Sequence, residues 1–325
     1  MGRLIKILSI DGGGIRGIIP AVVLSEIENR TQRPIAALFD LIAGTSTGGI
    51  VTLALTIPKT AGAPLYAAKQ LVDMYEREGG RIFSRPIWHR LKACGNLAHE
   101  KFPCSGIEGV LLEYFGGARL RDASTDVLIA SYEIERSVPF FFRSSMARHR
   151  PDYDFPARDV ARAASAAPTY FQPMKLPSGT NSDSYTLIDG GVFANNPAAC
   201  ALVEARTTHP AAAGYLVVSL GTGELVHSLV YDFAKDWGLA QWAAPMLDIV
   251  FDGVSKTVDY QLRQLLPDTA GHCQRYYRFQ TTLDGRNHRL DNASPANITA
   301  LKALGYELVE AKSDDLDKIC DELMK

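Results

Sequence analysis

Twice within its first sixty residues, the chain passes from an apolar strand through a glycine-rich turn into a helix. The apolar run LIKILSI ends at the turn 11–17, DGGGIRG, and the helical pattern IIPAVVLSEIENR follows it. A second apolar run, residues 39–43, meets the turn GTSTG, and an apolar helix follows from about Gly49. Parallel strands need such helical crossovers between them. The repeated unit therefore predicts an α/β fold built on a doubly wound, mostly parallel sheet.

The rest of the sequence continues this alternation without a low-complexity linker or a fixed-period repeat. TDVLIASYEIER, VPFFFRSS, TLIDGG and GYLVVSLGTG predict further strands, and LYAAKQLVDMYEREGG predicts an amphipathic helix that stops at its final glycine pair. Aromatic, basic and breaker residues mix between 81 and 106, as in a lid or a long insertion. We therefore expect one domain over 1–325, with its main motifs within 5–200 and a helical C-terminal part, 225–325, packed on it.

The balance of charge argues against nucleic acid as a partner. The 325 residues carry a formal net charge of −2, so no basic field favours a polyanion. Five scattered cysteines suit a reducing compartment, and no apolar stretch reaches the ~20 residues of a membrane-spanning helix. We expect a cytoplasmic protein with peripheral, transient membrane contact, although a processed precursor would look the same and secretion stays open. A homo-oligomer stays open as well.

The second glycine turn contains the pattern G-x-S-x-G from Gly44 to Gly48, with Ser46 at its centre. A serine on a sharp strand-to-helix turn is exposed at the edge of the sheet, and small flanking residues let the strand and the helix approach each other. The helix N-terminus behind it favours negative charge near a reacting carbonyl. In isolation the pattern more often marks an ordinary tight turn. Its strand–turn–helix setting favours Ser46 as a nucleophile.

The first glycine turn supplies a different kind of group. Gly12 to Gly17 fits the dinucleotide-binding pattern G-x-G-x-x-G, but no acidic residue ends a strand about twenty residues later. The clustered backbone N–H groups of Gly12, Gly13 and Gly14 instead predict an oxyanion hole for the tetrahedral intermediate of an ester. Arg16 either steadies this loop or meets a phosphate.

A serine nucleophile needs a base to accept its proton. None of the histidines lies beside a glycine turn at the end of a strand. They are His89, His99, His149, His209, His227, His272 and His288. Asp189 ends the strand TLID, is followed by Gly190 and Gly191, and is the best-placed titratable residue. A carboxylate can act as the base without a histidine, and burial would raise its ordinary pKa of about 3.9. Asp-Gly-Gly in isolation is typical of an exposed turn, so this role depends on the other two motifs.

Together, these three segments resemble the patatin family of phospholipases and lipid acyl hydrolases. In that family D-G-G-G-x-R/K-G forms the oxyanion hole, G-x-S-x-G carries the nucleophile, and D-G-G/A carries the catalytic aspartate. This chain has every element, at Asp11 to Gly17, Gly44 to Gly48, and Asp189 to Gly191. ARAASAAPTYFQP, YLVVSLGTG and LDNASPANITALKALG also look like patatin segments, whereas residues 60–125 show little resemblance.

The resemblance implies a three-layer α/β/α fold with a Ser–Asp dyad, no metal and no cofactor. Ser46 would attack an ester, and Asp189 would take its proton and later activate water, with an acyl-serine between the two steps. The implied substrates are membrane phospholipids and galactolipids, and the implied products are fatty acid and lysolipid. Some bacterial relatives are switched on by cyclic nucleotides, so an activator of that kind is an expectation by analogy alone.

Two other functions stay open on the sequence. The same acyl-serine could pass its acyl group to an alcohol or an amine, as in an acyltransferase. Alternatively, the chain could be a silent nucleotide-binding module that uses Gly12 to Gly17. For lipid access, the aromatic and basic stretch 81–92 could lie at a membrane interface, and the segment 232–254 could line an acyl tunnel. Packing of ordinary amphipathic helices explains both segments equally well.

Overall fold

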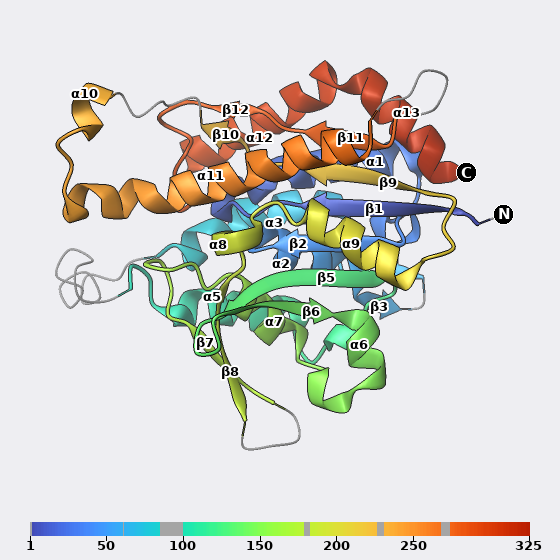
Figure 1. Ribbon diagram of the computed structural model, residues 1–325, viewed down its shortest axis with the longest axis horizontal. Coiled ribbons are helices and arrows are strands. Elements are labelled where there is room, and N and C mark those ends of the chain that lie inside the picture. The colour runs from blue at the N-terminus through green and yellow to red at the C-terminus, as the bar shows by residue number, and fades with distance from the viewer. Residues whose placement is uncertain (1, 61, 85–99, 179–182, 226–230, 268–273) are drawn as a thin grey trace.

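The structure is a computed structural model. It describes residues 2–60, 62–84, 100–178, 183–225, 231–267 and 274–325. An eight-stranded sheet lies at its centre (Figure 1). Neighbouring strands pair in parallel in the order β11 (Tyr276–Phe279), β9 (Gly214–Leu220), β1 (Leu4–Ile10), β2 (Leu41–Thr45) and β5 (Asp126–Glu133). This arrangement confirms the predicted mixed α/β class with a mostly parallel sheet.

Antiparallel strands complete the sheet around β5. They are β6 (Val138–Arg143), β7 (Met174–Pro177) and β8 (Ser184–Asp189). β6 pairs with β5 from Leu128 to Glu133, and β8 pairs with it from Ser131 to Glu133. β2 pairs with the earlier part of β5, up to Ala130. Because β6 occupies one edge of β5, β2 and β8 share the other edge, and their carboxyl ends meet there.

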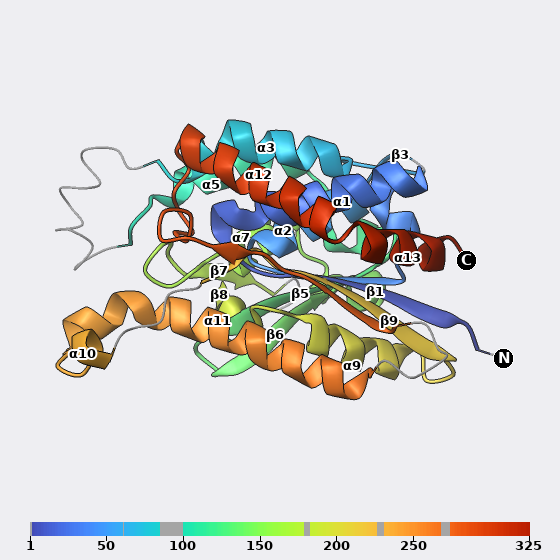
Figure 2. The same ribbon diagram turned by 90° about the horizontal axis from the view of Figure 1, so that it is seen from above.

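Helices cover both faces of the sheet and give a three-layer arrangement (Figure 2). One layer contains α1 (Ile18–Thr31), α2 (Thr47–Thr56), α3 (Ala68–Ile82), α5 (Cys104–Phe115), α7 (Ala157–Ala164), α12 (Pro295–Ala311) and α13 (Ser313–Met324). The opposite layer contains α9 (Ala198–Thr208) and α11 (Leu239–Leu265). The short helix α8 (Gly191–Ala194) packs against α11.

The smaller elements connect these layers. They are the helices α6 (Ser144–His149) and α10 (Tyr231–Ala234), the 3-10 turns η1 (Gly14–Gly17), η2 (Ile35–Ala37), η4 (Leu120–Asp122) and η5 (Pro151–Tyr153), and the strands β3 (Pro58–Thr60), β4 (Ala63–Pro64), β10 (Glu224–Leu225) and β12 (Thr282–Leu283). β3 pairs with β4, and β10 pairs with β12.

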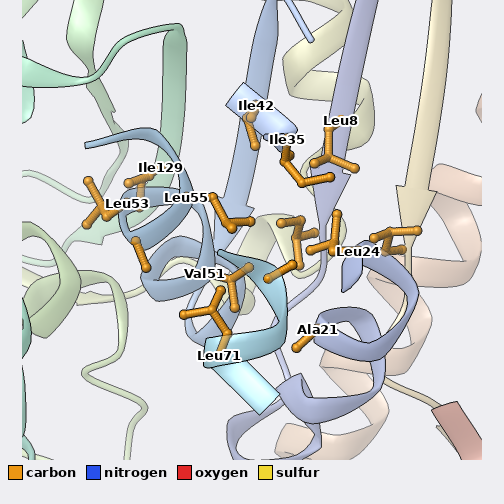
Figure 3. Close-up of a cluster of buried hydrophobic side chains, with 14 of the residues drawn as sticks. Leu8, Ala21, Leu24, Ile35, Ile42, Val51, Leu53, Leu55, Leu71 and Ile129 are labelled. Atoms are coloured by element: carbon orange, nitrogen blue, oxygen red, sulfur yellow. The ribbon is translucent and has the colours of Figure 1, made fainter. Parts of the chain in front are cut away.

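The strands are apolar on both sides because helices cover both faces of the sheet. On β1, Leu8 joins the larger core with α1 and α2, whereas Ile7 joins the smaller core with α9. This alternation is the two-residue period of a strand. Figure 3 shows the larger core, to which the strands contribute Leu8 and Ile42 and helix α2 contributes Val51.

The helix α3 differs from the expectation that it stops at its glycine pair. It runs through Gly79 and Gly80 to Ile82. Gly79 packs so closely on Ile15 that a Cβ there would lie 2.7 Å from Ile15 Cδ1. Packing of the helix against its neighbours therefore overrides the low helix propensity of glycine.

Two other boundaries also change. β2 begins and ends two residues later than the predicted 39–43, and its helix begins at Thr47 rather than near Gly49. The C-terminal part, 225–325, is not purely helical, since β11 forms an edge of the central sheet. Most of the insertion expected at 81–106 lies outside the described residues. No described helix combines the length and the hydropathy needed to span a membrane.

Candidate active site

Ser46 links β2 to α2 in a backbone conformation that residues other than glycine rarely adopt, with φ 54° and ψ −122°. The two arms of this turn touch directly. A Cβ on Gly44 would overlap the carbonyl of Gly48, and a Cβ on Gly48 would overlap the carbonyl of Ile10 in β1. Because these positions accept only glycine, the packing of β2, α2 and β1 holds Ser46 at the carboxyl edge of the sheet.

Asp189 lies at the same edge of the sheet as Ser46, at the end of a strand that runs in the opposite direction. It is the last residue of β8 and pairs with Ser131 of β5, one position beyond the pair formed by Ala130 and Thr45. Because β2 and β8 run toward each other along one edge of β5, Ser46 and Asp189 stand at strand ends that meet. The structure therefore brings the predicted nucleophile and base together, and both line the same cavity.

The carboxylate of Asp189 is completely buried. Its Oδ1 accepts a 2.8 Å hydrogen bond from the N–H of Gly191, while Gly190 packs against the backbone of Ala130. Its Oδ2 has no hydrogen-bond partner among the described residues, although the hydroxyl of Ser46 is close enough to favour the charged form. Burial outweighs both of these contacts and raises the pKa of Asp189 from 3.8 to about 6. Oδ2 is thus a stronger base than the oxygen of an exposed aspartate, and it is available for a proton.

The three N–H groups of the loop Gly12 to Gly14 are not equivalent. Gly12 donates its N–H to the carbonyl of Asn195 at 3.0 Å and is not among the residues that line the cavity. Gly13 and Gly14 do line it, and their N–H groups make no hydrogen bond within the described part of the chain. Of the three predicted N–H donors, two therefore line the cavity, those of Gly13 and Gly14. Only glycine fits at position 12, because a Cβ there would overlap Asn195 Oδ1 and lie 3.2 Å from Ser46 Cβ.

The segment before α12 fixes this loop from outside. Ile15 donates its N–H to the carbonyl of Leu290 at 2.9 Å. Gly14 lies against the same carbonyl with a φ of 56°, where a side chain would be strained and would overlap it. On the other side of the loop, the hydroxyl of Thr222 donates to the carbonyl of Gly12 at 2.6 Å.

Charged side chains hold both ends of the loop. Arg16 steadies it by donating from Nε to the carbonyl of Gly13 at 3.2 Å. Asp11 forms a buried ion pair with Arg278 of β11, with N–O distances of 3.0 and 2.6 Å. Arg278 also donates to Ser219 at 2.8 Å. Arg278 was not predicted from the sequence, because a single arginine in the strand YYRF carries no motif that marks it.

Further contacts tie the two turns to the aspartate. Gly17 packs against the hydrogen-bonded hydroxyls of Tyr75 and Thr47, and a side chain there would overlap both. Thr45 donates from its hydroxyl to the carbonyl of Ala194 at 2.6 Å, just beyond Asp189 in the chain. The turn at Ser46, the glycine loop and the segment after Asp189 are therefore held together by direct contacts.

The described histidines do not contribute to this site. His149, His209 and His288 are absent from the residues that line the cavity. The other four lie outside the described residues. Within the described ranges, no three His, Cys, Asp or Glu side chains gather in positions that could hold a metal ion.

Ser46 and Asp189 open onto an apolar cavity. Its walls are helices. They contribute Ile50 and Ala54, which lie one turn apart in α2, Met74 and Ile82, which lie two turns apart in α3, and the neighbours Val110 and Leu111 of α5. From Ser46 to Ala54 the wall of α2 rises by about 12 Å. A flexible hydrocarbon chain attached at Ser46 can therefore lie along α2.

The two segments considered for lipid access differ in what they contribute. Phe83 lines the cavity, and Arg81 joins α3 to α5 through ion pairs with Glu78 and Glu113 at 2.7 and 2.6 Å. The residues of 81–92 from 85 onward lie outside the described part. Among its described residues, the segment 232–254 contributes Phe251 alone to the cavity.

Comparison with known proteins agrees with this geometry. The sequence profile of the patatin-like phospholipase family matches residues 8–202. The chain belongs to the patatin-like phospholipase family. Patatin-like protein 4 and Patatin-like protein 2 of Arabidopsis thaliana are 33% and 35% identical to it, over 95% and 99% of this chain and 84% and 87% of their own. Family membership supports lipid acyl hydrolase activity in general terms.

The name of one patatin-like relative describes that protein as inactive. "Probable inactive patatin-3-Kuras 1" of Solanum tuberosum is 33% identical over 95% of this chain and 87% of its own. Among solved structures, VipD from Legionella pneumophila matches with a TM-score of 0.38 and 11% identity, over 95% of this chain and 67% of that one.

Proposed function

We propose that this protein hydrolyses fatty-acyl esters of membrane phospholipids or galactolipids through an acyl-serine on Ser46, and that it meets its substrate at a membrane surface. The observation that carries the proposal is that Ser46, Asp189, Gly13 and Gly14 all face one apolar cavity. A nucleophile, a base and two N–H donors are the groups that acyl transfer requires. The apolar walls supply a place for the acyl chain.

The first half of the reaction makes the acyl-enzyme. Ser46 Oγ attacks the ester carbonyl while its proton passes to Asp189 Oδ2. The N–H groups of Gly13 and Gly14 stabilise the negative oxygen of the tetrahedral intermediate. As the intermediate collapses, the bond to the leaving alcohol breaks and that alcohol takes the proton from Asp189, which releases the lysolipid.

The second half repeats the chemistry with water. Asp189 takes a proton from a water molecule as its oxygen attacks the acyl-serine carbonyl. The new intermediate releases the fatty acid, and the proton on Asp189 returns to Ser46 Oγ. A carboxylate with a pKa of about 6 is mostly charged at neutral pH and is a better base than an ordinary aspartate. The oxyanion donors are needed because this base is still weak.

The proposal is tested by the release of fatty acid from a phospholipid and a galactolipid of matched acyl composition. Wild type should release fatty acid and lysolipid in equal amounts, and Ser46→Ala should release neither. Addition of a simple alcohol shows whether the acyl group goes to water or to another acceptor. Equal activity of wild type and Ser46→Ala on both lipids would overturn the proposal.

A further inference from the structure

A buried ion pair joins two segments that lie on either side of the glycine loop and the base. The ammonium of Lys101 contacts Oδ2 of Asp291, and the two side chains are only 15% and 5% exposed. Arg289 adds a longer contact, from its Nε to Oδ1 of Asp291 at 3.3 Å. Burial alone would raise the pKa of Asp291, but these two cations hold it below its ordinary value. Such a pair holds its partners firmly, because separating them leaves a buried charge without a partner.

Asp291 holds the segment that fixes the glycine loop. It directly follows Leu290, whose carbonyl accepts the 2.9 Å hydrogen bond from Ile15. Gly14 lies against the same carbonyl. Asp291 is itself held in a turn, since its carbonyl accepts a 3.0 Å hydrogen bond from the N–H of Ala293. The place of Asp291 therefore determines where the loop presents the N–H of Gly14.

Lys101 holds the segment that fixes the base. Its N–H donates to the carbonyl of Thr169 at 2.9 Å, and its ammonium lies 4.9 Å from the centre of the Tyr170 ring, which lines the apolar cavity. Three residues before Thr169, the carbonyl of Ala166 accepts a 3.1 Å hydrogen bond from the N–H of Asp189. This segment thus connects Lys101 to Asp189.

We propose that the ion pair of Lys101 and Asp291 fixes the N–H donors of the glycine loop relative to the base Asp189. The inference rests on the proposed ester hydrolysis and names two positioning residues for it. Neither lines the cavity, so both act through the backbone groups beside them. The hydrogen bond of Gly12 holds the start of the loop, whereas the pair holds its end at Gly14. A misplacement of about 1 Å in such a group lowers a rate by about 10²-fold.

The test compares a p-nitrophenyl ester with its thiono analogue, in which sulfur replaces the carbonyl oxygen. Sulfur accepts hydrogen bonds poorly, so the ratio of the two kcat/KM values measures how well the N–H donors are placed. Wild type should favour the oxygen ester by about 10²-fold. Lys101→Met should lower kcat on that ester by about 10²-fold with little change in KM, and should reduce the ratio by about tenfold. Lys101→Arg keeps a cation for Asp291 and should restore most of both.

Two further variants separate positioning from folding. Lys101→Met combined with Asp291→Leu removes both charges, so no buried charge loses its partner. This double variant should fold and show the same losses as Lys101→Met. Lys302→Met is the matched control, because it removes a lysine from the 2.8 Å ion pair with Glu76, which joins α12 to α3. Neither residue of that pair lines the cavity, so kcat and the ratio should stay at the wild-type values.

Three results would overturn the positioning role. They are a double variant with the wild-type kcat and ratio, a Lys101→Met variant that loses kcat but keeps the wild-type ratio, and a Lys302→Met variant with the same losses as Lys101→Met. Wild type that hydrolyses neither ester would instead refute the proposed hydrolysis, and this role with it, so the two failures are distinguishable.

Discussion

The loops around Ser46 and Asp189 and the helical walls of the apolar cavity meet at Ser46, but they are built in different ways. In the loops, backbone touches backbone, as where Gly44 meets Gly48. In the walls, side chains such as Met74 and Val110 fill the space between helices. An added methyl group has no room in the first region, whereas the second tolerates apolar exchanges of similar volume. The difference predicts that the proposed reaction depends on backbone placement, and that the choice of acyl chain depends on side-chain volume.

Asp189→Asn should have the largest effect in the catalytic region. The amide keeps the shape of the side chain and can still accept the hydrogen bond from Gly191, but it cannot take the proton of Ser46. We expect kcat to fall by about 10³-fold or more, measured with a soluble p-nitrophenyl ester.

The same variant should be more stable than wild type. The pKa of Asp189 in the folded protein, about 6, exceeds its usual 3.8, so the folded state holds this proton more tightly than the unfolded chain. The charged group therefore costs stability as the pH rises from about 4 to 6, and the cost is fully present at pH 7.5. We expect urea unfolding to show a gain on the order of 1–3 kcal/mol for Asp189→Asn. A loss of both activity and stability would mean that Asp189 is a structural residue.

Gly14→Ala tests whether the donors depend on backbone placement. The new Cβ would overlap the carbonyl of Leu290 at a φ of 56°, so the loop must shift and its N–H groups must leave the oxyanion position. We expect kcat to fall by about 10²–10³-fold with little change in KM. The control is Gly80→Ala in α3, where the added methyl meets nothing within 4 Å. Equal kinetics for the two variants would contradict the contrast between loops and walls.

The pH dependence of wild-type activity tests the pKa of Asp189. Only the charged carboxylate can accept the proton of Ser46, and burial raises its pKa to about 6. We expect kcat/KM for a soluble ester to fall about tenfold for each pH unit below that value. An acid limb near pH 4 would show that Asp189 is not perturbed in the way the structure indicates.

Ala54→Leu tests the walls and should have the smallest effect. It adds volume at the far end of the α2 wall, two turns from Ser46. We expect kcat/KM to fall about fivefold on a long-chain ester and to stay unchanged on a short-chain ester. Ala311→Leu adds the same volume at an exposed position just inside the end of α12 and should change neither rate. A uniform loss on both esters would indicate misfolding rather than a shorter cavity.

The contrast between the two regions also explains what could be predicted from the sequence. Where backbones touch, only glycine fits, so the turns around Ser46 and Asp189 have glycine patterns that can be recognised in the sequence. The walls use Met74, Val110 and similar residues that any apolar helix could contain. They also fall in 60–125, where the sequence showed little resemblance to the family.

Other features depended on contacts between distant segments. The hydrogen bond from Gly12 to Asn195 removes one expected donor, and the ion pair between Asp11 and Arg278 joins the first strand to β11. Neither has a local signature. The meeting of β2 and β8 was equally hidden, because the antiparallel pairing of β8 follows from register rather than from composition.

The central claim is that Ser46 is the nucleophile and Asp189 is its base. The most direct measurement is covalent labelling by a fluorophosphonate, followed by peptide mass spectrometry, in wild type, Asp189→Asn and Ser46→Ala. The account predicts one adduct on the peptide that contains Ser46 in wild type, labelling slowed by about 10²-fold or more in Asp189→Asn, and no adduct in Ser46→Ala. An adduct on another residue, or labelling of Ser46 at the wild-type rate in Asp189→Asn, would contradict it.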